Sequence, residues 1–165
     1  MRMNLTCKLL FVTFLFLGFD VLAQKKSVTL ELSYYEPYCG GARPNDEILA
    51  ESQKPKPYAG RKVILISGTG KVDTLTTDAK GKIKVKLKTG EYSLMEPWRY
   101  YKRSFNGAPL EHFDKACLKT EWMKTIALLS VGKKKTKISF TNELSNYCEW
   151  NIPCLLETHA PPARE

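Results

Sequence analysis

The stretch TTDAKGKIKVKLKTGEYSL, residues 76–94, constrains the fold more than any other part of the chain. Its apolar residues Ile83, Val85 and Leu87 alternate with lysines, and a period of two is typical of a β-strand with one buried face. Gly81 and Gly90 stand at its two ends, where they permit tight turns. The stretch therefore predicts a strand bounded by turns, with its apolar side chains in a core.

Further strand signals precede and follow this stretch at the spacing of an antiparallel sandwich. They are SVTLELSYY (27–35), RKVILISG (61–68), VDTLTT (72–77), EYSLMEPW (91–98), WMKTIALLSV (122–131) and KTKISFTN (135–142). We therefore predict an all-β fold, a single antiparallel β-sandwich of about seven strands between Val28 and Thr141. Ile64 and Tyr92 are expected to join the alternating strand in its core. RKVILISG, nearly all apolar at its centre, fits a strand that is buried on both sides or that lies inside a sandwich.

Two short helices and an irregular tail are expected beside the strands. NDEILAES (45–52) can be capped by Asn45 or Asp46 and carries acids in its first turn, and a second helix is expected near LEHFDKACL (110–118). The insertion from Trp98 to about Glu121 mixes loop with this helix. After about residue 142 the sequence loses regular periodicity.

The first residues have the pattern of a secretory signal. Arg2 and Lys8 precede an apolar run from Leu9 to Phe19. Small residues of the kind that a signal peptidase recognises follow this run, up to Ala23. The run is about a dozen residues long, against roughly 20 for a helix that spans a bilayer. We expect residues 1–23 to be a cleaved signal peptide and 24–165 a single secreted or periplasmic domain without a membrane span; a retained anchor is the alternative.

Four cysteines follow the signal segment: Cys39, Cys117, Cys148 and Cys154. An even number in a secreted chain predicts two disulfides, with three possible connectivities. A Cys148–Cys154 bridge would close only a local turn, so we favour Cys39–Cys154 with Cys117–Cys148. A metal site is the alternative reading of these cysteines, but they lack the C-x2-C spacing of zinc ligands, and only His112 and His159 could add to them, so no bound metal is expected.

The order Thr77-Asp78-x-x-Gly81, then an alternating strand, then Leu87-x-x-Gly90-x-Tyr92 resembles the carboxypeptidase regulatory-like domain. The resemblance covers roughly Tyr58 to Glu96 and implies a transthyretin-like (prealbumin-like) β-sandwich. YCGGARP and YCEWNIPC lie outside that pattern. They resemble segments of small secreted proteins of Bacteroidetes-type bacteria, and this resemblance implies no known activity.

The best candidate for a binding surface is WRYYKRSF, residues 98–105. Aromatic faces stack on sugars or bases, and guanidinium groups pair with carboxylates or phosphates. The candidate ligand-binding residues are Trp98, Arg99, Tyr100, Tyr101, Lys102 and Arg103. Alternatively, this segment is a loop whose rings cap one end of the sandwich. The lysines at 82, 84, 86 and 88 are interpreted as a solvated strand face.

No set of catalytic residues is evident. With His112 and His159 the only histidines, a triad or a thiol–imidazole pair has one realistic base. Two classes of function follow. The first is a secreted, non-enzymatic binding module for an anionic glycan or another cell-surface component, such as a surface protein, which the charge of +9 favours. The alternative is a metal-handling protein or hydrolase that uses His112 with Cys117 or Cys39. No cofactor and no nucleic acid partner are expected.

Overall fold

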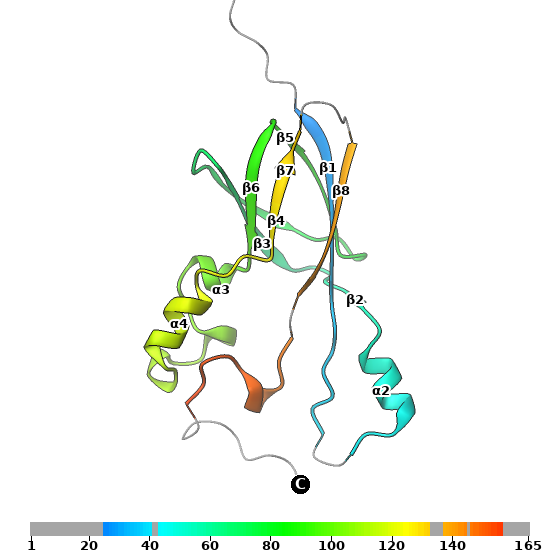
Figure 1. Cartoon of the computed structure of the whole chain (residues 1–165), viewed down its shortest axis with the longest axis vertical. Coiled ribbons are helices and arrows are strands. Elements are labelled where there is room, and N and C mark those ends of the chain that lie inside the picture. Colours follow the sequence, from blue (N-terminus) through cyan, green and yellow to red (C-terminus); the bar gives the residue numbers. More distant parts are fainter. Residues whose placement is uncertain (1–24, 41–42, 133–136, 145, 157–165) are drawn as a thin grey trace, which may run out of the picture.

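A computed structural model describes residues 25–40, 43–132, 137–144 and 146–156, and Figure 1 shows two β-sheets above a layer of short helices. The signal segment, the lysines at 133–135 and His159 lie outside these residues. One sheet has the order β4 (Val72–Thr76), β3 (Lys62–Ser67), β6 (Gly90–Met95), β7 (Ala127–Val131). All of its pairs are antiparallel, as predicted.

The second sheet is built around β1 (Lys26–Tyr34). On one side β1 pairs antiparallel with β5 (Lys82–Leu87) and with the two-residue β2 (Lys56–Pro57). On the other side it pairs parallel with β8 (Lys137–Leu144). A purely antiparallel sandwich is therefore wrong in this one respect. The physical reason is that the alternation of apolar residues predicts a strand but carries no information about its direction. The two parallel strands run toward Cys39 and Cys148, which are joined just beyond their ends.

The alternating strand behaves as predicted. Leu30 lies opposite Ile83 and Val28 opposite Val85, with their side chains turned to the other sheet. Ile83 and Leu87 are buried, Val85 is half-buried, and the lysines at 84, 86 and 88 are exposed. Lys82 forms an ion pair of 3.1 Å with Glu31 on β1. The lysines thus form the outer face of the sheet.

The core between the sheets is aliphatic. Its fully buried members are Val28, Leu30, Leu32, Val63, Leu65, Leu94, Leu129 and Val131. Tyr92 packs against this cluster, as expected. Ile64 does not belong to it, although it is buried. Its neighbours Val63 and Leu65 belong to the cluster between the sheets, so the alternation of side chains places Ile64 on the opposite face of β3. Of the two alternatives for this run, burial on both faces holds at the centre of β3, from Val63 to Leu65, and the placement of Ile64 in the shared core is wrong.

Short helices lie below the sheets. α2 (Asp46–Ser52) begins after Asn45, whose side chain accepts a hydrogen bond of 2.8 Å from the Ile48 N–H, as predicted. α3 (Pro97–Tyr100) follows β6 directly, and α4 (Lys115–Glu121) begins after Asp114. Single 3-10 turns occur at Phe105–Gly107 (η1), Leu110–His112 (η2) and Glu149–Asn151 (η3). In Figure 1, α2 lies at the lower right and α3 and α4 at the lower left.

The four cysteines form two disulfides, and the number is as predicted. The pairs are Cys39–Cys148, 109 residues apart, and Cys117–Cys154, 37 apart. The favoured connectivity is therefore wrong. Tyr34 lies beside Leu144 in the parallel pair, so Cys39 and Cys148 follow at nearly equal distances along adjacent chains. Two disulfides indicate an oxidising, extracytoplasmic environment. In the described part of the chain, no helix has the length and apolarity required to cross a bilayer.

The register generates a matched pair of substitutions on β5. Ile83→Ala should lower the free energy of unfolding by about 2–5 kcal/mol, because it leaves a cavity in the core. Lys84→Ser removes an exposed side chain and should change it by less than about 0.5 kcal/mol. Urea unfolding followed by fluorescence measures both. Equal effects at the two positions would contradict the register.

Gly81 provides a second test. It has φ +72°, and a Cβ there would lie 2.3 Å from the Leu32 carbonyl oxygen and 3.0 Å from the Tyr58 nitrogen. Gly70 has a similar φ of +83° but open space around it. Alanine at either position should cost roughly 1–2 kcal/mol for the left-handed backbone. Gly81→Ala should cost about 1–3 kcal/mol more than Gly70→Ala, because of the overlap. Urea unfolding measures both effects. Equal losses of unfolding free energy in the two variants would rule out the close packing at Gly81.

Candidate functional site

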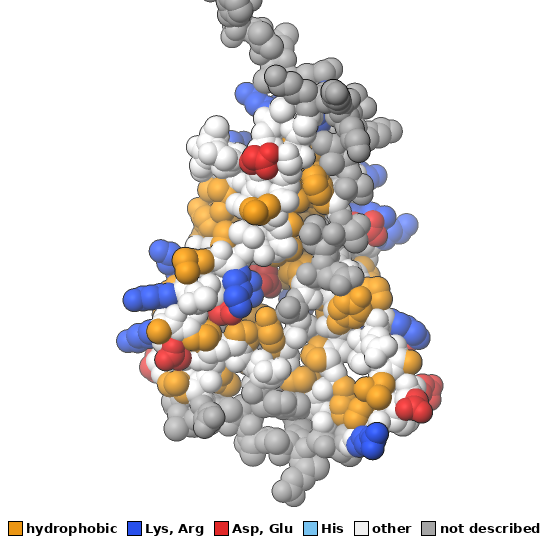
Figure 2. Space-filling model, in the orientation of Figure 1, with side chains coloured by type: hydrophobic (Ala, Val, Ile, Leu, Met, Phe, Trp, Pro, Cys, Tyr) orange, Lys and Arg blue, Asp and Glu red, His pale blue; other side chains and the backbone are white. Residues whose placement is uncertain are grey.

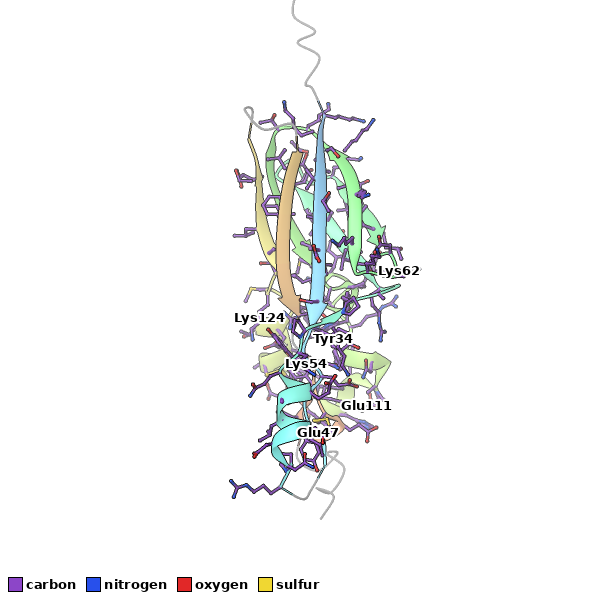
Figure 3. All side chains as sticks on the ribbon, turned by 90° about the vertical axis from the view of Figure 1, so that its right-hand side faces the viewer. Tyr34, Glu47, Lys54, Lys62, Glu111 and Lys124 are labelled. Carbon is purple, nitrogen blue, oxygen red and sulfur yellow. A yellow bond between two sulfur atoms is a disulfide. The ribbon has the colours of Figure 1, made fainter. Side chains whose placement is uncertain are left out.

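A hollow of about 620 Å³ lies at the end of the sandwich, where β1 ends and α3 begins. Figure 3 labels two of its residues, Tyr34 and Lys62, at the lower end of the strands. Aromatic rings form much of its wall, from Tyr34, Tyr58, Trp98, Tyr101 and Phe105. Its charged residues are Arg61, Lys62, Arg103, Glu36 and Glu96. The hollow therefore combines ring faces with charge of both signs.

The α3 side of the hollow is formed by a compact reversal of the chain. Pro97 opens the helix, where its fixed φ suits the first turn. The chain then turns back at Lys102, which has φ 53°, and the Arg103 N–H donates to the Trp98 carbonyl at 2.8 Å. The Phe105 ring packs edge-on against Trp98 at 5.7 Å between centroids. This reversal places Trp98, Tyr101, Arg103 and Phe105 around one space.

Arg99 has a different position from its neighbours, because its side chain is buried. Its Nε lies 3.3 Å from a Glu96 carboxylate oxygen, and a terminal nitrogen lies 3.1 Å from Glu121 on α4. Glu121 also pairs with Lys124, and the guanidinium lies 4.8 Å from the Trp98 ring. Arg99 thus ties α3 to α4. Removing one partner of such a buried pair typically costs about 3–5 kcal/mol.

The opposite wall is held by the residues of the Thr-Asp-x-x-Gly motif. The Thr77 hydroxyl accepts a hydrogen bond of 2.9 Å from the Arg61 N–H and donates to the Tyr58 carbonyl. The Tyr58 N–H donates to the Leu32 carbonyl at 2.9 Å, beside Gly81. The backbone of the 58–61 loop is therefore held by hydrogen bonds at both of its ends, with the Thr77 hydroxyl and with the Leu32 carbonyl. The side chains of Tyr58 and Arg61 are left to face the hollow.

The charges around the hollow are unequally neutralised. Glu36 pairs with Lys56, and Glu96 pairs with Arg99. Among the described residues, no carboxylate lies within ion-pair distance of Arg61, Lys62 or Arg103. Arg61 and Arg103 instead lie over the rings of Tyr58 and Tyr101, at 6.0 and 5.4 Å from the centroids. The hollow consequently has a surplus of cations.

Burial changes the proton affinity of two groups here. It raises the pKa of the Glu96 carboxyl above its ordinary value, and the nearby Arg99 opposes that shift. Burial also raises the pKa of the Tyr58 phenol, assisted by the Glu96 charge and opposed by Arg61. Tyr58 therefore remains a hydroxyl at neutral pH and can donate a hydrogen bond to an anion.

Three of the six candidate ligand-binding residues line the hollow: Trp98, Tyr101 and Arg103. Arg99 is buried in its ion pairs, Tyr100 packs on Tyr101 at 5.0 Å, and Lys102 extends into solvent, so these three line no part of it. Sequence reasoning missed Tyr34, Glu36, Tyr58, Arg61, Lys62 and Glu96. The signal that could have found some of them is PYAGR (57–61), an aromatic and a cation in the turn before a buried strand.

The residues of the alternative function do not form a thiol site. Cys39 and Cys117 are both in disulfides, so neither sulfur is a free thiolate in this state. His112 ends η2, and its carbonyl accepts a hydrogen bond of 2.9 Å from the Leu156 N–H. Within residues 25–40, 43–132, 137–144 and 146–156, no three His, Cys, Asp or Glu side chains are grouped as metal ligands.

No protein-family model and no curated protein matches the chain. The structure is distantly similar to the Bacillus anthracis TIE protein, with 16% identity and a TM-score of 0.36, over 72% of this chain and 17% of that one. It is also similar to a DUF3823 family protein from Parabacteroides merdae, with 13% identity and a TM-score of 0.38, over 79% of this chain and 47% of that one. The chain spans less than half the length of each, and similarity of this degree assigns no family.

The environment of Glu96 generates a pH prediction. Because its pKa is raised in the folded state, its contribution to stability is fully present below the ordinary glutamate pKa of about 4.3 and is lost as pH rises through the raised value. The wild type should therefore lose stability relative to Glu96→Gln as pH rises through that window. Urea unfolding of both proteins at a series of pH values measures the difference. A difference that does not change with pH, or one that grows in favour of the wild type, would contradict the assignment.

Proposed function

We propose that this protein is a secreted, non-enzymatic binding module that holds an acidic sugar of an anionic glycan in the hollow between Tyr58 and Tyr101. One observation carries the proposal: aromatic ring faces stand beside three cations, Arg61, Lys62 and Arg103, that no described carboxylate neutralises. A ligand that is flat on one face and carries a carboxylate satisfies both features.

The chemistry of recognition follows from these groups. The exposed ring of Tyr101 offers a stacking surface to a sugar ring, while the guanidinium groups of Arg61 and Arg103 can each form two parallel hydrogen bonds with a carboxylate. The protonated Tyr58 hydroxyl supplies a further donor. Charged hydrogen bonds are worth about 1.5–3 kcal/mol each when they are well formed.

We further propose that the domain is a carboxypeptidase regulatory-like, transthyretin-like sandwich. The motif residues form a tight turn, which fits the resemblance, but this turn is not a hairpin because β4 and β5 belong to different sheets. Asp78 accepts hydrogen bonds of 2.8 Å from the N–H groups of Lys80 and Lys82, and Gly81 ends the turn at positive φ. The Tyr92 hydroxyl donates to the Lys88 carbonyl at 3.0 Å. These contacts support the family assignment by local structure.

The place of action that fits this function is outside the cytoplasm. We propose that residues 1–23 direct export and are removed, releasing a periplasmic or secreted protein. The oxidising environment that both disulfides require supports this location. Anionic polysaccharides are abundant polyanions at cell surfaces, and the positive charge of the chain favours encounter with them.

Substitutions at the hollow test the function. Arg103→Ala and Tyr101→Ala should each weaken binding of an acidic glycan by about 10- to 100-fold, since each removes about 1.4–2.8 kcal/mol of contact. Both side chains are exposed, so the fold should be retained. Isothermal titration calorimetry against glucuronic-acid- and sialic-acid-bearing glycans at two ionic strengths measures the effect. Higher salt should weaken wild-type binding, because the charged contacts are exposed.

Lys102→Asn is the matched control. It removes a neighbouring cation that does not line the hollow, and asparagine tolerates the φ of 53° at this position. It should change affinity by less than about twofold, since the net charge alone is screened at moderate salt. Equal losses for Lys102→Asn and Arg103→Ala would mean that only overall charge matters. No binding of any acidic glycan by the wild type would refute the proposal.

A further inference from the structure

A second hollow, of about 680 Å³, lies beside the first, between α2 and the chain segments that follow β1 and β8. Its wall includes Tyr38, Ile48, Ser52 and Tyr147. Glu36 and Asn146 line both hollows, so the two share a boundary. Figure 3 shows α2, with Glu47 and Lys54 labelled near it, directly below the end of β1 at Tyr34.

An aromatic chain joins the walls of the two hollows. Trp98 packs edge-on against Phe105 at 5.7 Å, and Phe105 packs edge-on against Tyr147 at 5.5 Å. Trp98 and Phe105 belong to the first hollow and Tyr147 to the second. The Cys39–Cys148 disulfide follows Tyr147 directly and holds this wall against the end of the β1 chain. The shared boundary is therefore a fixed surface.

The two hollows differ in charge. In the second, Glu36 pairs with Lys56 and Glu51 pairs with Lys54 at 2.8 Å, so its carboxylates are neutralised. Ile48, which is 41% exposed, adds an apolar surface, and Figure 2 shows hydrophobic side chains gathered at the lower right, where α2 lies. The first hollow keeps its surplus of cations. One end of the combined surface thus suits an anion, and the other suits an uncharged group with an apolar face.

We propose that the two hollows form one groove for an oligosaccharide, in which an acidic sugar lies in the first hollow and neutral sugars continue into the second. This inference rests on the proposed function and specifies its ligand. Sugars fit because they present an apolar ring face together with hydroxyl groups. A peptide fits less well, because peptides commonly add to a free strand edge. At the groove, Tyr34 of β1 is already flanked by Lys56 on one side and Leu144 on the other.

The test compares short and long probes on the full mature protein. Titration calorimetry is run with glucuronic acid, glucuronic-acid-capped xylotriose and xylotriose, and with N-acetylneuraminic acid, sialyllactose and lactose. In at least one series the capped oligosaccharide should bind at least about tenfold more tightly than its acidic monosaccharide, because a second surface is engaged. The neutral oligosaccharide should bind most weakly of the three.

Ile48→Ala and Tyr38→Ala separate the two hollows. Each should reduce the affinity for the capped oligosaccharide at least about fivefold, toward that of the monosaccharide, and leave the monosaccharide within about twofold. Leu49→Ala is the matched control: Leu49 is the next residue of α2 and equally exposed at 41%, but it lines neither hollow. It should change neither affinity by more than about twofold.

The outcomes distinguish this inference from the proposed function. Equal affinity for monosaccharide and capped oligosaccharide, with Arg103→Ala still weakening both, would overturn the extended groove and leave the acidic-sugar site standing. Equal effects of Ile48→Ala and Leu49→Ala would also overturn the groove. No binding in either series would overturn both proposals. Displacement of the glycan by an acidic peptide of higher affinity would replace the sugar with a peptide as the occupant.

Discussion

The hydrogen bonding of β1 on both of its edges is the constraint on which the rest of the structure depends. β5 and β2 occupy one edge and β8 the other, from Ser27 to Tyr34. Because its inward residues Val28, Leu30 and Leu32 are fully buried, β1 also supplies the centre of the core. Its last residue reaches the candidate site. Core, disulfide and hollow all take their positions from this one strand.

The part of the fold set by local pattern could be predicted from sequence. The alternation of apolar residues with lysines around Val85 predicted the strand and the exposure of its lysines, and Asn45 predicted the start of a helix. The parallel partner of β1 could not be predicted, because strand periodicity carries no information about direction. The direction of this strand decides which cysteines come together, so the predicted disulfide connectivity was wrong for the same reason. Ile64 was misplaced for a related reason: in a run that is apolar throughout, periodicity does not identify which face meets which neighbour.

The candidate site was only half visible in the sequence. Trp98, Tyr101 and Arg103 lie close together in the sequence, and this cluster predicted a binding surface. Tyr58 and Arg61 belong to a different loop, about 40 residues away, and reach the same hollow because Thr77 and Gly81 hold that loop in place. A row of alternating aromatic and basic residues also does not reveal which side chains are buried. Arg99 has two carboxylate partners, one of them on α4, and only the tertiary structure brings that carboxylate to it.

The Cys39–Cys148 bond has a mechanical consequence for a protein tethered at its ends. The bond joins the segment 25–39 to the segment 148–156. A continuous covalent path therefore runs from Lys25 to Leu156 through these two segments alone. Tension applied between the ends is therefore carried along β1 and across the sulfur atoms, and it bypasses the residues between them. If the bond is reduced, the same pull acts across the parallel β1–β8 ladder and opposes its hydrogen bonds together, in shear. The redox state of one bond thus decides whether an external force loads the hydrogen bonds between β1 and β8.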